Sequence, residues 1–426
     1  MTEPPSSQVP EPSIGYVIRR HAHDPLLTAL SDTRVVVLLG ARQVGKSTLA
    51  RTVAAEIDGM ETASLDNRTL REAANSDPKG FLAARRRPML VDEIQRAPDL
   101  LFEIKDIVDN DETPGQFLLA GSANILTAPK IREALTGRAE YLTLCPLSQA
   151  EIARVERNLV DDLLSGEPPP VAGAPVGRDA FAGIVATGGY PEARRRAPDR
   201  RGAWFRDYIR SLVERDLRDI SDAEKLDQVP RLLRLVASQA ANLFVPSAIG
   251  SKLKLDKETV ATYTRLLETI YIVQRVQAWT PGIGSREIQH EKIYIVDSGL
   301  MAHLLGANEK RIRADDQVTG KILENFVAME IARLAEAAES APRHYHYRQE
   351  SGRDEIDILL ETDSGEIAAA EVKAAATVSP SDYRALVKLR DARGSRFIAG
   401  VVFYTGPETL ALTDRIWALP ISGLWA

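Results

Sequence analysis

The sequence contains only one cysteine, Cys145, among its 426 residues, so no disulfide can form within the chain. A chain without disulfides suits a reducing compartment, and we therefore expect a cytoplasmic protein. Long apolar runs are also missing, since no stretch of about 18 residues is apolar enough to form a membrane-spanning helix. We therefore expect no membrane partner.

Positive charge is not in excess either, because the formal net charge is −6. No global positive field would attract nucleic acid, so any contact with DNA requires a local basic surface. The first segment, residues 1–13, is rich in Pro, Ser and Glu and lacks the basic and apolar regions of a signal peptide. We expect this segment to be a disordered tail.

A phosphate-binding pattern is present at residues 40–47 (GARQVGKS), which fit G-x-x-x-x-G-K-[ST]. The β-branched apolar run Val35–Leu39 before it is typical of a buried strand, and residues 47–54 after it favour a helix. Glycines let the backbone approach phosphates, which the loop amides and the helix N-terminus then bind. We expect Lys46 to reach the β- and γ-phosphates and Ser47 to ligate Mg²⁺. The predicted nucleotide-binding residues are Gly40, Ala41, Arg42, Gln43, Val44, Gly45, Lys46, Ser47 and Thr48.

A second apolar run, residues 88–93 (PMLVDE), ends in two carboxylates. It is typical of a buried parallel strand, whose carboxyl end is where such sheets bind ligands. Asp92 can hold Mg²⁺ through water, and Glu93 is then placed as the catalytic base that polarises the attacking water. The alternative is a strand that simply ends in solvated acids.

A third strand is expected at residues 117–120, followed by Ser122 and Asn124. Either side chain could orient water against the γ-phosphate, or could instead cap the next helix. Arg138 is a candidate catalytic residue, because a guanidinium is always charged and can neutralise charge in the transition state. Arg132 competes for this role. The alternative for either arginine, and the more common state of one taken singly, is an ordinary surface residue.

The middle of the chain changes to helical periodicity. Helices are expected around residues 204–217, 230–240 and 256–270, followed by two strands at 271–273 and 292–296 that flank a Gly/Pro loop at 281–284. Three helices and a two-stranded hairpin describe a winged helix, in which the last helix would dock on DNA.

That helix would present Lys257, Thr262 and Arg265 to DNA. Its acidic neighbours weaken this interpretation: Asp256, Glu258 and Glu268. The alternative is a helical lid or a module that contacts another protein. Asp256 is also a plausible N-cap of the helix.

The last third of the sequence predicts a helix over residues 318–335 and strands over 344–348, 354–360 and 367–373. Residues two apart on a strand share one face, so Glu371 and Lys373 lie together. If the hairpin aligns its two strands, Asp357 lies beside Glu371 and Lys373. The helix over residues 318–335 then adds Glu324 to this group.

Carboxylates in such a group bind hard cations, which makes Glu324, Asp357 and Glu371 candidate Mg²⁺ ligands. The metal and Lys373 could activate water against a phosphodiester. The alternative is an ordinary half-buried strand, in which charged and apolar residues also alternate.

With these motifs the chain resembles the prokaryotic AAA-type ATPases that carry a C-terminal DUF4143 domain. The residues that carry the resemblance are 40–47, 91–95 (VDEIQ), 120–122 (AGS), 136–138 (TGR), 188–191 (GGYP) and 371–373 (EVK). The family's last domain is regarded as similar to the PD-(D/E)xK nuclease fold, which implies catalytic roles for Asp357, Glu371 and Lys373. Ile356 stands where the name of that motif has proline.

We therefore expect an α/β protein of three parts: a phosphate-loop ATPase domain with a parallel sheet over residues 14–200, a winged-helix domain over 201–300 and a nuclease-like domain over 301–426. The predicted function is ATP binding and hydrolysis with Mg²⁺, directed at DNA. The alternative is a nucleotide-dependent switch that binds a protein partner and whose last domain is inactive. The expected partners are ATP or ADP, DNA, and either further copies of the chain or another protein.

Overall fold

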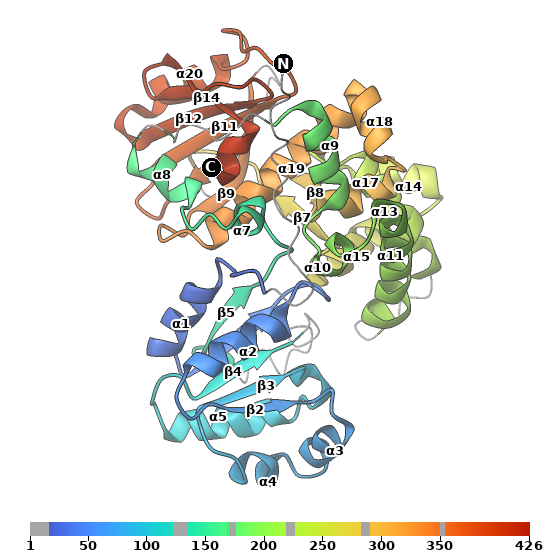
Figure 1. Cartoon of the computed structure of the whole chain (residues 1–426), viewed down its shortest axis with the longest axis vertical. Helices are drawn as coiled ribbons and strands as arrows, with labels where there is room; N and C mark the ends of the chain where they lie inside the picture. The colour runs from blue at the N-terminus through green and yellow to red at the C-terminus, as the bar shows by residue number, and fades with distance from the viewer. Residues whose placement is uncertain are drawn as a thin grey trace, which may run out of the picture.

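The computed structural model describes residues 17–121, 135–167, 169, 176–218, 226–282, 290–349 and 354–426. A five-stranded, a three-stranded and a six-stranded β-sheet organise these residues. The five-stranded sheet and its helices form the lower part of the molecule in Figure 1, and the other two sheets lie in the upper part. The expected α/β fold is confirmed. Among the described helices we find none with the length and apolar character that a bilayer crossing requires.

The five-stranded sheet is wholly parallel, with the strand order β2-β3-β4-β1-β5. Every residue of β1 (Val35–Leu39) is buried, because Val36 faces the core that holds α2 and Val37 faces the core that holds α5. The other strands are β2 (Glu61–Ser64), β3 (Met89–Asp92), β4 (Phe117–Ala120) and β5 (Ala139–Thr143). The helices are α1 (His23–Asp32), α2 (Lys46–Glu56), α3 (Arg68–Ser76), α4 (Pro78–Ala83), η1 (Ile94–Arg96) and α5 (Leu100–Asn110).

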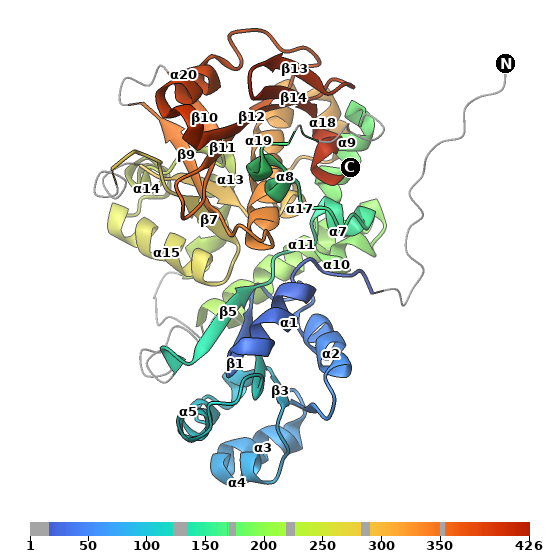
Figure 2. The same ribbon diagram turned by 90° about the vertical axis from the view of Figure 1, so that its left-hand side faces the viewer.

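The helices after β5 pack against the upper part of the molecule, as both views show (Figure 1 and Figure 2). They are α7 (Gln149–Ala153), α8 (Leu159–Ser165), α9 (Arg178–Thr187), α10 (Pro191–Arg194), α11 (Pro198–Ser211) and the π-helical turn η3 (Leu212–Leu217). Phe181 on α9 packs edge-on against Phe326, with 5.9 Å between the ring centroids. The side-chain amide of Asn158 donates to the carbonyl of Leu334 at 2.8 Å. These contacts favour a domain boundary soon after β5, and the division expected at residue 200 stays a prediction.

The middle of the chain forms a helical unit on a small antiparallel sheet of strand order β6-β8-β7. Its elements are η4 (Leu226–Gln228), α13 (Val229–Ser238), β6 (Asn242–Leu243), α14 (Pro246–Leu253), α15 (Lys257–Thr269), β7 (Val273–Val276) and β8 (Lys292–Ile295). A hairpin forms between β7 and β8, as expected, but β7 begins at Val273 and so shares only that residue with the strand expected at 271–273. Asp256 caps α15 as predicted, because its carboxylate accepts a hydrogen bond from the Thr259 amide at 2.7 Å.

The six-stranded sheet is mixed, with the strand order β13-β14-β12-β11-β10-β9. Its strands are β9 (Arg343–Arg348), β10 (Glu355–Glu361), β11 (Ile367–Lys373), β12 (Phe397–Tyr404), β13 (Leu410–Thr413) and β14 (Ile416–Pro420). The nearby helices are α17 (Ser298–Leu304), α18 (Glu309–Ala314), α19 (Asp316–Glu336), α20 (Arg384–Arg393), η5 (Gly394–Arg396) and η6 (Ile421–Trp425). Ile358 packs with the core that includes α19, whereas Leu359 packs with α20, so helices cover both faces of the β10–β11 hairpin.

The GGYP motif at residues 188–191 has a structural role in this fold. The Gly189 amide donates to the buried carboxylate of Asp297 at 2.6 Å, just before α17. A Cβ on Gly189 would lie 2.2 Å from the Leu147 carbonyl oxygen, so only glycine fits there. The motif therefore joins the segment after β5 to the helices of the upper part.

Candidate functional site

The phosphate-binding pattern forms the loop between β1 and α2. Gly40, Gln43 and Gly45 have positive φ angles of 143°, 62° and 103°, so the backbone turns repeatedly before the helix begins. A Cβ on Gly40 would lie 2.2 Å from the Leu144 carbonyl oxygen, which explains why glycine is needed at this position. The loop thereby leads into the N-terminus of α2, where free backbone amides favour an anion.

Lys46 is buried at the start of this helix, with 7% of its surface exposed. Its ammonium donates to the carbonyls of Gly40 at 2.9 Å and Ala41 at 2.8 Å. Burial lowers the pKa of Lys46 to about 8, although the nearby carboxylates Glu93 and Asp92 favour the charged form. The ammonium therefore lies within the loop that phosphates would enter.

Ser47 and Asp92 meet at the carboxyl ends of β1 and β3. The Ser47 hydroxyl donates to Asp92 Oδ1 at 2.9 Å, and Asp92 Oδ2 pairs with Arg51 at 3.2 Å. A hydroxyl and a carboxylate are the hard oxygen donors that Mg²⁺ prefers. The chemistry of this donor set fits a magnesium ion.

Glu93 follows Asp92 directly and takes a left-handed conformation with φ 60°. Its carboxylate accepts a hydrogen bond from the Gln95 side chain and lies 3.9 Å from the Arg96 guanidinium. Glu93 is thus held on the same edge of the sheet as Lys46 and Asp92. A carboxylate there can accept a proton from water.

Arg42, within the loop, pairs with Asp216 of the π-helical turn η3, although these residues are far apart in the sequence. The Asp216 side chain is 3% exposed. The Tyr208 hydroxyl on α11 donates to the Arg42 carbonyl at 3.2 Å. The sequence interpretation missed this contact between the loop and the segment after β5, because no local pattern marks Asp216.

Arg138 lies at the opposite edge of its sheet and is therefore not beside the chain's own phosphate loop. Its expected role in neutralising transition-state charge, if supplied to the nucleotide of a neighbouring subunit, stays a prediction. Arg138 precedes β5, and Ala139 pairs with Val35 at the amino end of β1, whereas the phosphate loop follows the carboxyl end. Its guanidinium pairs with Asp109, with Nη2 at 2.9 Å from Oδ2. Ser122, Asn124 and Arg132 lie outside the described residues, and Thr48 is exposed in the first turn of α2.

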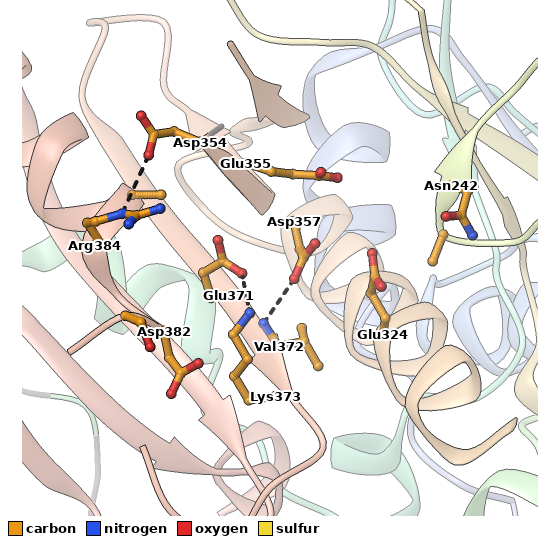
Figure 3. A pocket seen from close by; sticks show the side chains of 13 residues that line it. Asn242, Glu324, Asp354, Glu355, Asp357, Glu371, Val372, Lys373, Asp382 and Arg384 are labelled. Atoms are coloured by element: carbon orange, nitrogen blue, oxygen red, sulfur yellow. Dashed lines mark hydrogen bonds and ion pairs between the residues drawn. The ribbon is translucent and has the colours of Figure 1, made fainter. Parts of the chain in front are cut away.

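A second candidate site is a pocket of about 420 Å³ beside β10 and β11. Figure 3 shows Asp357, Glu371 and Lys373 pointing toward one another, with Glu324 of α19 close by. Lys373 Nζ donates to Glu371 Oε2 at 3.3 Å, and the Val372 amide donates to Asp357 Oδ2 at 3.0 Å. The four residues expected to converge are therefore brought together.

A buried lysine that sequence reasoning missed lies among these carboxylates. Lys292, at the start of β8, places Nζ 3.0 Å from Glu324 Oε1, 2.9 Å from Glu355 Oε1 and 3.0 Å from Asp357 Oδ1. Its side chain is 2% exposed. Sequence reasoning could not identify these contacts. Lys292 is the first residue of an apolar strand, and its partners Glu324 and Asp357 are 32 and 65 residues away in the sequence.

The ionisation of the cluster reflects burial and this crowding. Burial together with the neighbouring Asp357 raises the pKa of Glu371 to about 9 and that of Glu324 to about 8. Burial opposes ionisation of Asp357 as well, but the Lys292 ammonium keeps the pKa of that carboxyl below its usual value. Asp357 therefore stays charged beside Lys292.

The expected Mg²⁺ site in this pocket is not supported. In the ranges that the structure describes, no group of three or more His, Cys, Asp or Glu side chains is arranged to hold a metal ion. Glu324, Asp357 and Glu371 are close together, but an ammonium lies against two of them. The residues present do not fit a divalent cation.

Family models match three segments of the chain. Residues 32–153 match the AAA domain, residues 178–311 match a domain of unknown function (DUF8612), and residues 319–424 match a domain of unknown function (DUF4143). The resemblance expected from the sequence motifs is thus confirmed. The chain carries an AAA domain of the phosphate-loop ATPase class, followed by a DUF4143 domain.

Relatives cover nearly the whole chain. The uncharacterized protein Rv2008c of Mycobacterium tuberculosis is 28% identical over 406 residues, which span 94% of this chain and 83% of that protein. The uncharacterized protein Mb2031c of Mycobacterium bovis matches to the same extent.

Among solved structures, the Walker-type ATPase PABY2304 of Pyrococcus abyssi is similar over 68% of this chain and 96% of that chain, at 16% identity and a TM-score of 0.44. A mutant RuvB of Thermotoga maritima is similar over 62% of this chain and 90% of that chain, at 17% identity and a TM-score of 0.30.

The pKa of Lys46 leads to a prediction about pH. In the free loop this pKa is about 8, and bound phosphates will raise it because they favour the ammonium. Above about pH 8 the free Lys46 is mostly neutral, so ADP binding must be accompanied by uptake of a proton by Lys46. We therefore expect ADP affinity to fall about tenfold between about pH 7 and about pH 9. Titration calorimetry at several pH values measures this. The Lys46→Arg variant, which stays charged, should lose the dependence. A wild-type affinity that is constant across this range would contradict the assignment.

Proposed function

We propose that this chain binds ATP in the loop between β1 and α2 and hydrolyses it with the help of Mg²⁺. The observation that carries the proposal is the meeting of Lys46, Asp92 and Glu93 at one edge of the parallel sheet, beside the N-terminus of α2. This edge is where open parallel sheets bind ligands.

Each residue has a distinct part in the proposed reaction. Lys46 exchanges its two carbonyl partners for phosphate oxygens, and the loop amides bind the remaining phosphate charge. Ser47 and Asp92 hold Mg²⁺, which when bound neutralises charge that develops on the phosphates. Glu93 accepts a proton from the attacking water.

We further propose that the nucleotide acts as a switch on the rest of the molecule. Arg42 belongs to the phosphate loop, and its partner Asp216 belongs to η3, which continues α11. Phosphates beside Arg42 compete with Asp216 for the guanidinium, because both are anions. Binding of nucleotide to the loop can therefore weaken this ion pair and so change the stability of η3 and of α11, which precedes it.

Two substitutions test the hydrolysis itself. Lys46→Ala should abolish ATP hydrolysis and weaken nucleotide binding, because the ammonium that meets the phosphates is removed. Glu93→Gln should keep binding but slow turnover at least about a hundredfold, because an amide cannot accept the proton of water. Phosphate release and calorimetry measure the two effects. Unchanged turnover in Lys46→Ala would refute the site, and an absence of binding in Glu93→Gln would make Glu93 a structural residue.

A third substitution tests the switch. In the wild type, nucleotide should increase amide hydrogen exchange in η3, because Asp216 loses its partner. Asp216→Asn should show exchange about tenfold faster without nucleotide, and nucleotide should then change it little. Asp207→Asn is the matched control, since Asp207 lies on α11 but is exposed and pairs only weakly with Arg210 at 4.0 Å. The switch is refuted if Asp216→Asn keeps the full nucleotide-dependent change of the wild type.

A second candidate activity is binding to DNA through the helical unit of residues 226–295. The supporting observation is a group of exposed basic residues on α14, α15 and the turn between them: Lys252, Lys254, Lys257 and Arg265. Glu268 is neutralised by Arg275 at 2.7 Å, which removes one of the acids that opposed this interpretation. Asp256 and Glu258 stay exposed beside the group and oppose it.

We predict that Lys257→Ala combined with Arg265→Ala weakens binding to duplex DNA roughly tenfold. The salt dependence of log affinity should also become shallower, by about one unit of slope for each DNA phosphate that the variant no longer neutralises. Fluorescence anisotropy at several salt concentrations measures both. Lys310→Ala, an exposed lysine on α18, serves as the control. Equal affinity and slope in the double variant and the wild type would exclude α15 as the DNA-binding helix.

A further inference from the structure

We propose that the ammonium of Lys292 takes the place of a divalent cation in the C-terminal pocket, so that this pocket binds no catalytic metal and cleaves no phosphodiester. This inference concerns the DUF4143 domain and is independent of ATP hydrolysis. It favours the interpretation of the chain as a nucleotide-dependent switch over that of a nuclease.

The first argument is the arrangement of donors and acceptors. An ammonium has three N–H donors, and Lys292 Nζ lies within 3.0 Å of three carboxylates, those of Glu324, Glu355 and Asp357. These carboxylates come from α19 and β10, which belong to the segment that matches DUF4143, whereas Lys292 comes from β8. The cation that gathers the acids is thus supplied by the chain itself.

The second argument is that each oxygen of Asp357 already accepts a hydrogen bond, and one of the donors is an ammonium. Its Oδ1 accepts from Lys292 at 3.0 Å and its Oδ2 accepts from the Val372 amide at 3.0 Å. Glu371 is paired with Lys373 at 3.3 Å. A divalent cation between Asp357 and Glu371 would therefore approach two ammonium groups of like charge.

The third argument is that Lys292 is not free to withdraw. Its strand β8 is the central strand of the small sheet, where Lys292 pairs with Leu243 on one side and Val276 on the other. The side chain is 2% exposed, and moving it away would leave buried carboxylates without a partner, at a cost of several kcal/mol. The internal cation is a fixed part of the fold.

Binding of Mn²⁺ to the nucleotide-free protein, counted by electron paramagnetic resonance, tests the proposal. The wild type should bind no more Mn²⁺ than Asp357→Asn does. Lys292→Met, which keeps an unbranched side chain but removes the ammonium, should bind about one further Mn²⁺ per chain. Mn²⁺ should also raise the melting temperature of this variant more than that of the wild type, because the ion binds only the folded state. Any Mn²⁺ near Asp92 is common to all three proteins.

Comparing the wild type with Asp357→Asn and Lys373→Ala can overturn the proposal, whether or not Lys292→Met folds without metal. A wild-type Mn²⁺ site that Asp357→Asn removes would overturn it. Plasmid nicking by the wild type with Mg²⁺ or Mn²⁺ that Lys373→Ala abolishes would also overturn it. Nicking that never occurs, together with equal Mn²⁺ binding by wild type and Asp357→Asn, supports it. ATP hydrolysis is measured separately in each variant, so failure of this inference is distinguishable from failure of the ATPase assignment.

Discussion

The direction of the strands is the constraint on which the nucleotide site depends. All strands of the first sheet run parallel, so β1 and β3 end at the same edge, and the residues that follow them must meet there. The loop after β1 brings Lys46 and Ser47, and the end of β3 brings Asp92. The same constraint sends Arg138, which precedes β5, to the opposite edge.

Buried ion pairs then connect the sites to distant segments. Arg42 in the phosphate loop pairs with Asp216 in η3, and Lys292 in β8 pairs with carboxylates of α19 and β10. Removing one partner of a buried pair costs more than the pair itself contributes, because the other charge is left without compensation. Such pairs therefore fix how segments are arranged. In this chain the Arg42 pair involves the loop that would bind phosphates, whereas the Lys292 pairs hold carboxylates that line the C-terminal pocket.

The features of the fold and of the two sites that depend on neighbouring residues could be predicted from the sequence. Strand, glycine loop and helix are contiguous, so the phosphate loop and its lysine were predictable, as was the shared face of Glu371 and Lys373 on β11. The roles of Lys292 and Asp216 could not be predicted from the sequence. Their partners lie far away along the chain, and neither residue departs from the residue pattern of its own strand or helix. The position of Arg138 at the far edge was not predictable from its charge, because it depends on the direction of β5.

A structure of the chain with bound ADP and Mg²⁺ tests the central claim most directly. The account predicts that Lys46 Nζ leaves the carbonyls of Gly40 and Ala41 and contacts a phosphate oxygen, with the metal beside Ser47 and Asp92. A nucleotide bound elsewhere on the molecule would contradict it. So would a nucleotide bound in the loop while Lys46 keeps both carbonyl partners.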